Sequence, residues 1–178
     1  MNIEKADYGT IVQFGSLDDV IQKLIIEEKS IADVIDITDE NGMSLLEKSL
    51  VARKFDIAKY LLDNNAKVNI VSNSGYNEFH YIASNIDCDG AIQIARILLR
   101  RGTSLILQDN RFGNSAIFTL CMEIFKSRTE EGLAFLEECI LCVTDIDTCN
   151  KNGYSLRILI SERGTDRLKT ILEEKDEK

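Results

Sequence analysis

Two residue types are missing from this sequence, proline and tryptophan, and histidine occurs once, as His80. Proline averages about 5% of residues in proteins, so its absence argues against a fold built on many proline turns. Because nucleophilic catalysis needs a base beside the nucleophile, a histidine-dependent site could be built only around His80. The sequence has no Gly-x-Ser-x-Gly motif, cysteine-protease signature or glycine-rich phosphate loop. We therefore expect a protein that is not an enzyme and needs no cofactor.

Long hydrophobic runs are absent as well. No stretch approaches the ~18 apolar residues of a membrane-spanning helix, and the opening segment "MNIEKADYGTIVQFG" has no apolar core or basic leader of a signal peptide. The cysteines are an odd number outside a secretory context, which is typical of reduced thiols. They are Cys88, Cys121, Cys139, Cys142 and Cys149. These features predict a cytoplasmic protein without membrane contacts.

The chain carries an excess of negative charge, −9 at pH 7, with a pI near 4.7. Acidic surfaces repel phosphate backbones, so nucleic-acid binding is not expected. Residues 1–64 hold 13 Asp and Glu against 7 Lys and Arg, a net charge of −6 in the first third. This end would attract a basic protein partner. The alternative is a solvated acidic surface that only aids solubility.

A pattern repeats along the chain, and its first two copies are 33 residues apart. "DENGMSLLEKS" begins at Asp39, and "SNSGYNEFHYIAS" begins 33 residues later at Ser72. Glycine suits a turn position with positive φ, and Ser or Asn two residues later suits a helix N-cap. This combination occurs as Gly42 with Ser44, Gly75 with Asn77, Gly113 with Ser115, and Gly153 with Ser155. The pattern predicts a turn, a cap and a helix, four times.

A second amphipathic segment follows each of these short helices. Apolar residues recur at helical spacing within 56–69, 92–106 and 166–175. Asn65 and Gly102 stand where a left-handed C-cap belongs. Residues 9–38 look like a degraded first unit, in which "GSLDDVIQKLI" (15–25) supplies the second helix with apolar Val20, Ile21, Leu24 and Ile25. We therefore predict five units of two antiparallel helices.

These units resemble the ankyrin repeat. The best match is 39–71, where the family pattern is kept in register by Asp39, Gly42, Ser44, Leu46, Leu61, Leu62, Ala66, Val68 and Asn69. The family's Thr-Pro-Leu-His motif is nowhere intact, and insertions fall near 84–91 and 126–132. The resemblance covers nearly the whole chain. It implies one all-α domain over 1–178, a solenoid of stacked antiparallel helix pairs joined by projecting turns, with units at about 1–38, 39–71, 72–108, 109–149 and 150–178.

In the ankyrin family, partners usually bind to the projecting turns and to the concave face lined by the first helices. Position by position, the resemblance implies a protein-binding set formed by Glu40, Asn41, Met43, Asn73, Ser74, Tyr76, Arg111, Phe112, Asn114, Lys151, Asn152 and Tyr154. The exposed first-helix positions are expected to be Val51, Ala52, Ser84, Asn85, Met122, Glu123, Glu162 and Arg163.

Each turn places one large apolar or aromatic residue beside its glycine: Met43, Tyr76, Phe112 and Tyr154. Turn tips are normally polar, so a row of such side chains would make a binding stripe with aromatic hot spots. The alternative is that each ring folds back over its neighbour and covers the stack. We expect binding first at Tyr76 and Phe112, because Tyr154 could belong to a terminal cap.

The single histidine occupies the histidine position of the Thr-Pro-Leu-His pattern. The other three units have Glu47, Phe118 and Ile158 there. In the ankyrin family this histidine ties neighbouring turns together by hydrogen bonds. The resemblance therefore implies that His80 is structural, neutral and partly buried.

Two metal sites can be considered. "NIDCDGAIQIAR" (85–96) resembles part of a calcium loop, but Arg96 stands where the last glutamate ligand belongs, so a polar loop is favoured. Zinc or redox chemistry could use Cys121, Cys139, Cys142 and Cys149. Because Cys139 and Cys142 share a helix face and buried cysteine packs as a small hydrophobe, core packing is favoured. No metal is expected.

The leading hypothesis is a non-catalytic interaction module, monomeric when free, that binds another protein through its finger turns and concave face. One alternative is an acidic immunity-type protein that neutralises a cognate basic toxin in bacteria. The second alternative is a zinc-binding or redox protein built on the cysteines. The identity of the partner does not follow from the fold, because repeat surfaces host many partners.

Overall fold

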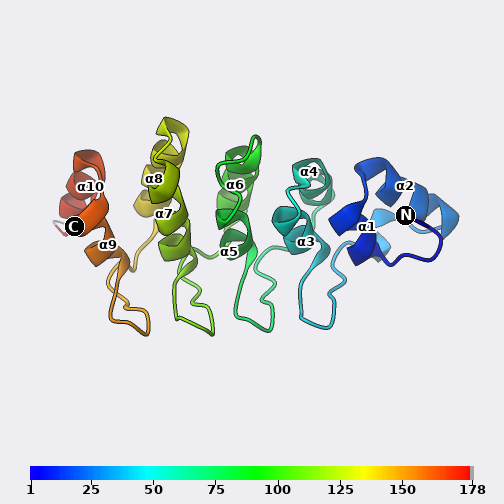
Figure 1. Ribbon diagram of the computed structural model, residues 1–178, viewed down its shortest axis with the longest axis horizontal. Helices are drawn as coiled ribbons and strands as arrows, with labels where there is room; N and C mark the ends of the chain where they lie inside the picture. The colour runs from blue at the N-terminus through cyan, green and yellow to red at the C-terminus, as the bar shows by residue number, and fades with distance from the viewer. Residues whose placement is uncertain (177–178) are drawn as a thin grey trace.

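The structure, a computed structural model, describes residues 1–176 and is all-helical, with its helices arranged in pairs along a single row (Figure 1). The two termini lie at opposite ends of the row, and the loops between pairs project to one side. The pairs are α1 (Tyr8–Phe14) with α2 (Leu17–Ile26), α3 (Leu45–Val51) with α4 (Phe55–Asp63), α5 (Glu78–Ala83) with α6 (Ala91–Arg100), α7 (Ala116–Ser127) with α8 (Glu130–Cys142), and α9 (Leu156–Arg163) with α10 (Asp166–Asp176). A short 3-10 turn, η1 (Ile31–Asp33), follows the first pair. Within 1–176 the chain forms no strand beyond two isolated bridges, so the all-α prediction is confirmed.

The first helices begin at the predicted caps. The hydroxyl of Ser44 accepts from the Glu47 N–H at 3.1 Å, and the hydroxyls of Ser115 and Ser155 make the same bond at 3.2 Å. Asn77 is the N-cap of α5. These bonds satisfy backbone donors that have no partner inside the helix. The local sequence therefore sets where each pair starts.

Left-handed backbone positions end the helices and shape the turns. Gly42, Gly75, Gly113 and Gly153 have φ between 69° and 79°. Asn65 (φ 67°) and Gly102 (φ 77°) follow α4 and α6. Residues with a Cβ rarely adopt a positive φ, which explains why glycine recurs at these positions in the sequence.

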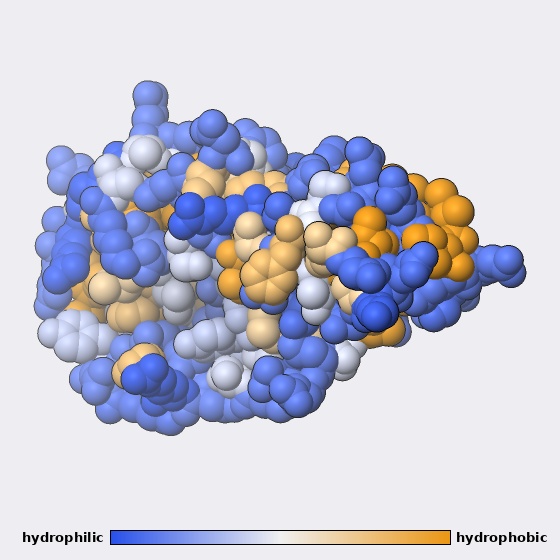
Figure 2. Space-filling view, turned by 45° about the vertical axis from the view of Figure 1, so that its right-hand side comes forward, coloured by the Kyte–Doolittle hydropathy of each residue, from blue (hydrophilic) through white to orange (hydrophobic). Residues whose placement is uncertain are grey.

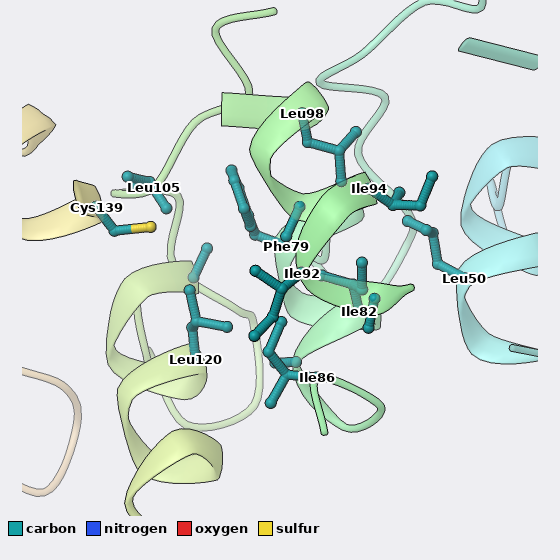
Figure 3. Packing of buried hydrophobic residues seen from close by; sticks show 14 of the residues in the cluster. Leu50, Phe79, Ile82, Ile86, Ile92, Ile94, Leu98, Leu105, Leu120 and Cys139 are labelled. Atoms are coloured by element: carbon teal, nitrogen blue, oxygen red, sulfur yellow. The ribbon is translucent and has the colours of Figure 1, made fainter. Parts of the chain in front are cut away.

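The hydrophobic core runs along the row, between and within the pairs. First helices pack in the order α1, α3, α5, α7 and α9, and second helices pack in the order α4, α6, α8 and α10. Figure 3 shows Leu50 of α3, Phe79 and Ile82 of α5, Leu98 of α6 and Leu120 of α7 converging from neighbouring pairs. Each of these five side chains is fully buried. Because every pair completes its neighbour's core, no single pair can bury its apolar face alone.

The first pair differs from the others in its packing. Helix α2 packs on α1, but it does not pack along α4 in the way that α4 packs along α6. Its four apolar positions are divided: Val20 and Leu24 are buried, whereas Ile21 and Ile25 are exposed.

The two predicted insertions have different structures. Residues 84–90 form a loop between α5 and α6. The extra residues near 126–132 instead lengthen helices, because α7 continues to Ser127 and α8 begins at Glu130.

Asn85 was expected to be exposed, and this prediction is wrong. Its amide donates to the carbonyls of Leu50 at 3.0 Å and Val51 at 3.1 Å, and its Oδ1 accepts from the guanidinium of Arg53 at 2.7 Å. The side chain is buried between α3 and the next unit, where it satisfies carbonyls at the end of α3 that have no partner inside the helix.

No helix in residues 1–176 is long and apolar enough to cross a membrane.

Candidate protein-binding site

Four projecting turns, here called fingers 1 to 4, comprise residues 39–43, 72–76, 109–114 and 150–154. In finger 1 the Asp39 carboxylate accepts from the N–H groups of Asn41 and Met43, each at 2.9 Å. In finger 4 the Asn150 side chain accepts from Asn152 and Tyr154, each at 3.0 Å. A short polar side chain at the start of a turn folds the backbone around its own oxygen. The fingers therefore take their shape locally.

Backbone hydrogen bonds join each finger to the next. The Asn73 N–H donates to the Asn41 carbonyl, the Asn110 N–H to the Ser74 carbonyl, and the Lys151 N–H to the Phe112 carbonyl, each at 2.9 Å. The fingers thus form one continuous ribbon. A surface held in this way is already ordered before a partner arrives.

Side-chain hydrogen bonds also join the fingers. The side chains that make them already have partners within the protein. Asn73 donates to the Glu40 carbonyl at 3.0 Å, Lys151 donates to the Asn110 carbonyl at 2.6 Å, and Asn150 donates to Asn114 Oδ1 at 2.7 Å. Three residues of the predicted binding set, Asn73, Asn114 and Lys151, therefore have structural partners within the protein.

Asn110 is a ribbon residue that the sequence analysis missed. Its amide donates to the Asn73 carbonyl at 3.1 Å, in addition to the backbone bond to Ser74. The available signal was register: Asn110 follows Asp109 as Asn73 follows Ser72 and Lys151 follows Asn150. In fingers 2, 3 and 4 the residue after the first residue of the turn reaches back to the preceding finger.

Tyr76 is half-buried and folds back over its own unit. Its ring stacks on His80, with centroids 5.0 Å apart and an angle of 6° between planes, and meets Tyr81 edge-on at 5.5 Å. The structure therefore places Tyr76 in the covering arrangement that was the alternative to a binding tip. The Tyr81 hydroxyl donates to Ser72 at 2.9 Å and completes this small cluster.

His80 lies beneath Tyr76 and bridges two units. Its Nε2 is 3.3 Å from the Asn114 carbonyl of finger 3, and its Nδ1 is 3.3 Å from the Asn77 N–H. Nδ1 is also 3.0 Å from Asn77 Oδ1. Burial lowers the pKa of His80, against the raising effects of Asn114 and Asp109. These are the contacts of a neutral histidine that joins finger 3 to the helix pair before it.

Phe112 and Tyr154 present exposed rings on adjacent fingers, 43% and 45% exposed. The Arg111 guanidinium lies 4.7 Å from the centre of the Phe112 ring. Arginine over an aromatic face keeps its charge and remains available to carboxylates. The end of the ribbon formed by fingers 3 and 4 is therefore aromatic and cationic.

The opposite end of the ribbon is acidic and hollowed. A cavity of about 400 Å³ lies between α1 and finger 1 and is lined by Asp7, Thr10, Gln13, Asp39, Glu40, Met43 and Lys48, among others. Lys48 pairs with Asp39 at 2.6 Å. Partial burial by itself would raise the pKa of Asp39. Lys48 and the N–H groups of Met43 and Asn41 stabilise the carboxylate more strongly, so its pKa lies below the ordinary value. The Asp39 carboxylate is thus kept ionised at the mouth of this cavity.

The cysteines do not gather into one site. Cys121 and Cys139 are fully buried, and burial raises the pKa of both thiols. Cys142 and Cys149 are exposed. The expectation that Cys142 packs in the core beside Cys139 is wrong, because α8 ends at Cys142 and turns that side chain to solvent. Within residues 1–176 no group of three or more His, Cys, Asp or Glu side chains could hold a metal ion.

The fold and the ribbon define an all-helical protein of stacked helix pairs with a preformed row of turns. No family model matches the chain, and no curated protein matches it. Among solved structures it is similar to a chain in the structure of the Bd0816 predatory endopeptidase from Bdellovibrio bacteriovorus in complex with the immunity protein Bd3460. The TM-score is 0.61, with 19% sequence identity over 94% of this chain and 80% of that chain. At this identity the likeness shows a shared fold.

Proposed function

We propose that this chain is a non-catalytic, protein-binding protein of the immunity type, which neutralises a cognate toxin or endopeptidase by covering it. The observation that carries the binding function is the pair of exposed rings, Phe112 and Tyr154, on fingers that are already joined by hydrogen bonds. The immunity role is supported by the similar solved structure, which contains an immunity protein together with an endopeptidase.

We also propose that the helix pairs are ankyrin repeats. This is supported by the positive φ of the four turn glycines, by the N-caps two residues after them, and by the bond from His80 to the next turn. The five free cysteines favour a reducing, cytoplasmic compartment.

Binding by this surface would need little rearrangement. Ordering a flexible loop on binding costs free energy, and the ribbon of bonded fingers avoids most of that cost. Aromatic residues with few rotatable bonds are frequent hot spots, so Phe112 and Tyr154 would supply most of the affinity. Asp7, Asp39 and Glu40 would steer a basic partner toward the opposite end of the same ribbon.

The experiment uses the genes that flank the one for this chain. We expect a neighbouring gene to encode a protein that slows growth when expressed alone, and we expect co-expression of this chain to restore growth. A Phe112→Ala/Tyr154→Ala double variant should lose the protection. Leu141→Ala, which truncates an exposed residue of α8 away from the fingers, should retain it.

Two outcomes would count against the proposal. Growth restored equally by the double variant, shown to be folded by circular dichroism, would move the binding surface off fingers 3 and 4. Flanking gene products that are harmless and do not bind this chain would remove the immunity role.

A further inference from the structure

The N-terminal end of the row is unusually apolar. Phe14 and Ile25 are each 70% exposed, and Met1, Ile21 and Ile26 are exposed as well. Figure 2 shows hydrophobic side chains gathered at the end of the molecule that carries α1 and α2. Soluble proteins rarely leave a contiguous apolar patch to water unless something binds there.

Helix geometry explains how this patch forms. Leu17, Ile21 and Ile25 are four residues apart and share one face of α2, beside the buried face made by Val20 and Leu24. Gly15 brings the end of α1 against the start of α2, and the Met1 side chain lies close to it. We call the surface formed by Met1, Phe14, Leu17, Ile21 and Ile25 the apolar end face.

The opposite end of the row shows what a solvent-facing end looks like in this chain. The exposed residues of α10 within the described range are polar: Asp166, Arg167, Thr170, Glu173, Glu174 and Asp176. Terminal units of a stacked array need a polar outer face to stay in solution. Only the C-terminal end meets this requirement, so the apolar end face is not simply a cap.

Charge decides what kind of molecule fits the apolar end face. Residues 1–33 contain seven Asp and Glu against three Lys. Two of those lysines, Lys23 and Lys29, are already paired with Glu27 at 2.7 and 2.9 Å. Asp18, in the first turn of α2, and Glu28, two residues after its end, are both exposed. A second copy of this chain would bring like charges together around the patch.

We propose that the apolar end face is a docking surface for a segment of another protein that has one apolar side bordered by Lys or Arg. The aliphatic side chains would bury the apolar side, and Asp18 and Glu28 would pair with the basic border. This surface is separate from the fingers and does not rest on the proposed immunity function.

The probe is a synthetic amphipathic peptide of about five helical turns, with leucines on one face and lysines on the other. A matched peptide replaces every lysine by glutamate. Fluorescence anisotropy with the full chain should show at least ~10-fold tighter binding of the lysine peptide than of the glutamate peptide. An Ile21→Ser/Ile25→Ser variant keeps the net charge and should bind the lysine peptide at least ~10-fold more weakly.

Two controls locate the binding on this surface. Leu141→Ser removes an exposed aliphatic side chain from α8 and should change the affinity less than ~2-fold. Phe112→Ala/Tyr154→Ala should also bind the lysine peptide like the unmodified chain, which separates this surface from the fingers. If Ile21→Ser/Ile25→Ser fails to fold, Asp18→Lys/Glu28→Lys keeps the apolar residues and should reverse the preference between the peptides.

Three results would overturn the proposal. The first is equal binding of the lysine peptide by the folded Ile21→Ser/Ile25→Ser variant and the unmodified chain. The second is equal affinity for the lysine and glutamate peptides. The third is dimerisation of the unmodified chain in sedimentation analysis that the Ile21→Ser/Ile25→Ser variant abolishes, since a second copy would then be the occupant.

Discussion

At the scale of single residues, Glu47 and Glu78 are carboxyl groups whose pKa is strongly raised. Both side chains are fully buried. One oxygen of each accepts a backbone N–H, from Ser44 and Asn69, while Oε1 of each has no hydrogen-bond partner within the described residues. Burial raises the pKa of Glu47 to about 8 and that of Glu78 to about 7. Glu47 is therefore protonated in the folded protein at neutral pH.

This protonation predicts how stability depends on pH. The folded pKa values of about 8 and about 7 lie above the ordinary 4.5, so the folded state binds more protons than the unfolded state between these limits. The stability linked to these two groups is therefore fully present below about pH 4.5 and is lost as the pH rises toward 8. We expect the free energy of unfolding, measured with urea, to drop by more than about 1 kcal/mol between pH 5 and 8.

Glu47→Gln should flatten this profile, because the amide keeps the shape and cannot ionise. Glu40→Gln is the control, since Glu40 is exposed on finger 1. If Glu47→Gln and the unmodified chain lose stability equally over this range, Glu47 is not the group responsible.

His80 supports a second residue-scale prediction. His80→Ala removes the ring that bonds to Asn114 and stacks on Tyr76. The loss of a buried hydrogen-bonded ring should lower the free energy of unfolding by about 2–3 kcal/mol in urea titrations. Tyr154→Ala, which truncates an exposed ring, should change it by less than about 0.5 kcal/mol. A His80→Ala effect no larger than this control would show that His80 does not tie the units together.

At the scale of the elements, the joined fingers can be tested with two glycines of nearly identical conformation. Gly75 and Gly153 have φ of 77° and 79°. A Cβ on Gly75 would lie 2.9 Å from the backbone nitrogen of Asn110 in the next finger, whereas a Cβ on Gly153 would meet nothing within 4 Å. The two sites therefore differ in crowding and not in backbone strain.

Gly153→Ala should cost about 1 kcal/mol, the strain of a left-handed alanine. Gly75→Ala should cost at least about 1 kcal/mol more, because the backbone bond from Asn110 to Ser74 must shift. Thermal unfolding of both variants measures the difference. Equal melting temperatures would mean that finger 2 is not held tightly against finger 3.

The sequence predicted those elements that depend on residues close together along the chain. The caps at Ser44, Ser115 and Ser155, and the left-handed turn glycines, need only neighbours within three or four positions. The roles of Asn85 and Asn110 depend on partners more than 30 residues away, so no local pattern showed that Asn85 is buried or that Asn110 joins two fingers.

The different roles of the aromatic residues at the finger tips could not be predicted from the sequence for the same reason. Tyr76 and Phe112 look equivalent in the sequence, but Tyr76 stacks on His80, whereas Phe112 contacts the Arg111 guanidinium on one side and stays 43% exposed. Only the packing of each ring shows whether it covers its own unit or is available to a partner. Likewise, Ile21 and Ile25 share the apolar pattern of α2, and only the structure shows that these two side chains are exposed within residues 1–176.

At the scale of the whole molecule, the surface is divided along the row. The ribbon of fingers runs from an acidic cavity beside α1 to an aromatic and cationic end at fingers 3 and 4. A rigid surface with opposite charges at its two ends fixes the orientation of a partner as well as its affinity. The proposed immunity function would need this kind of fixed orientation, because a neutralising protein has to cover one particular region of its target.

The most direct test is a calorimetric titration of the purified chain against the purified product of the neighbouring gene. The proposed function predicts a one-to-one complex. Phe112→Ala/Tyr154→Ala should weaken it by at least ~30-fold, because each ring is expected to contribute more than about 1 kcal/mol, while Leu141→Ala should leave it unchanged. An affinity that is the same for the unmodified chain and the folded double variant would contradict binding through these fingers.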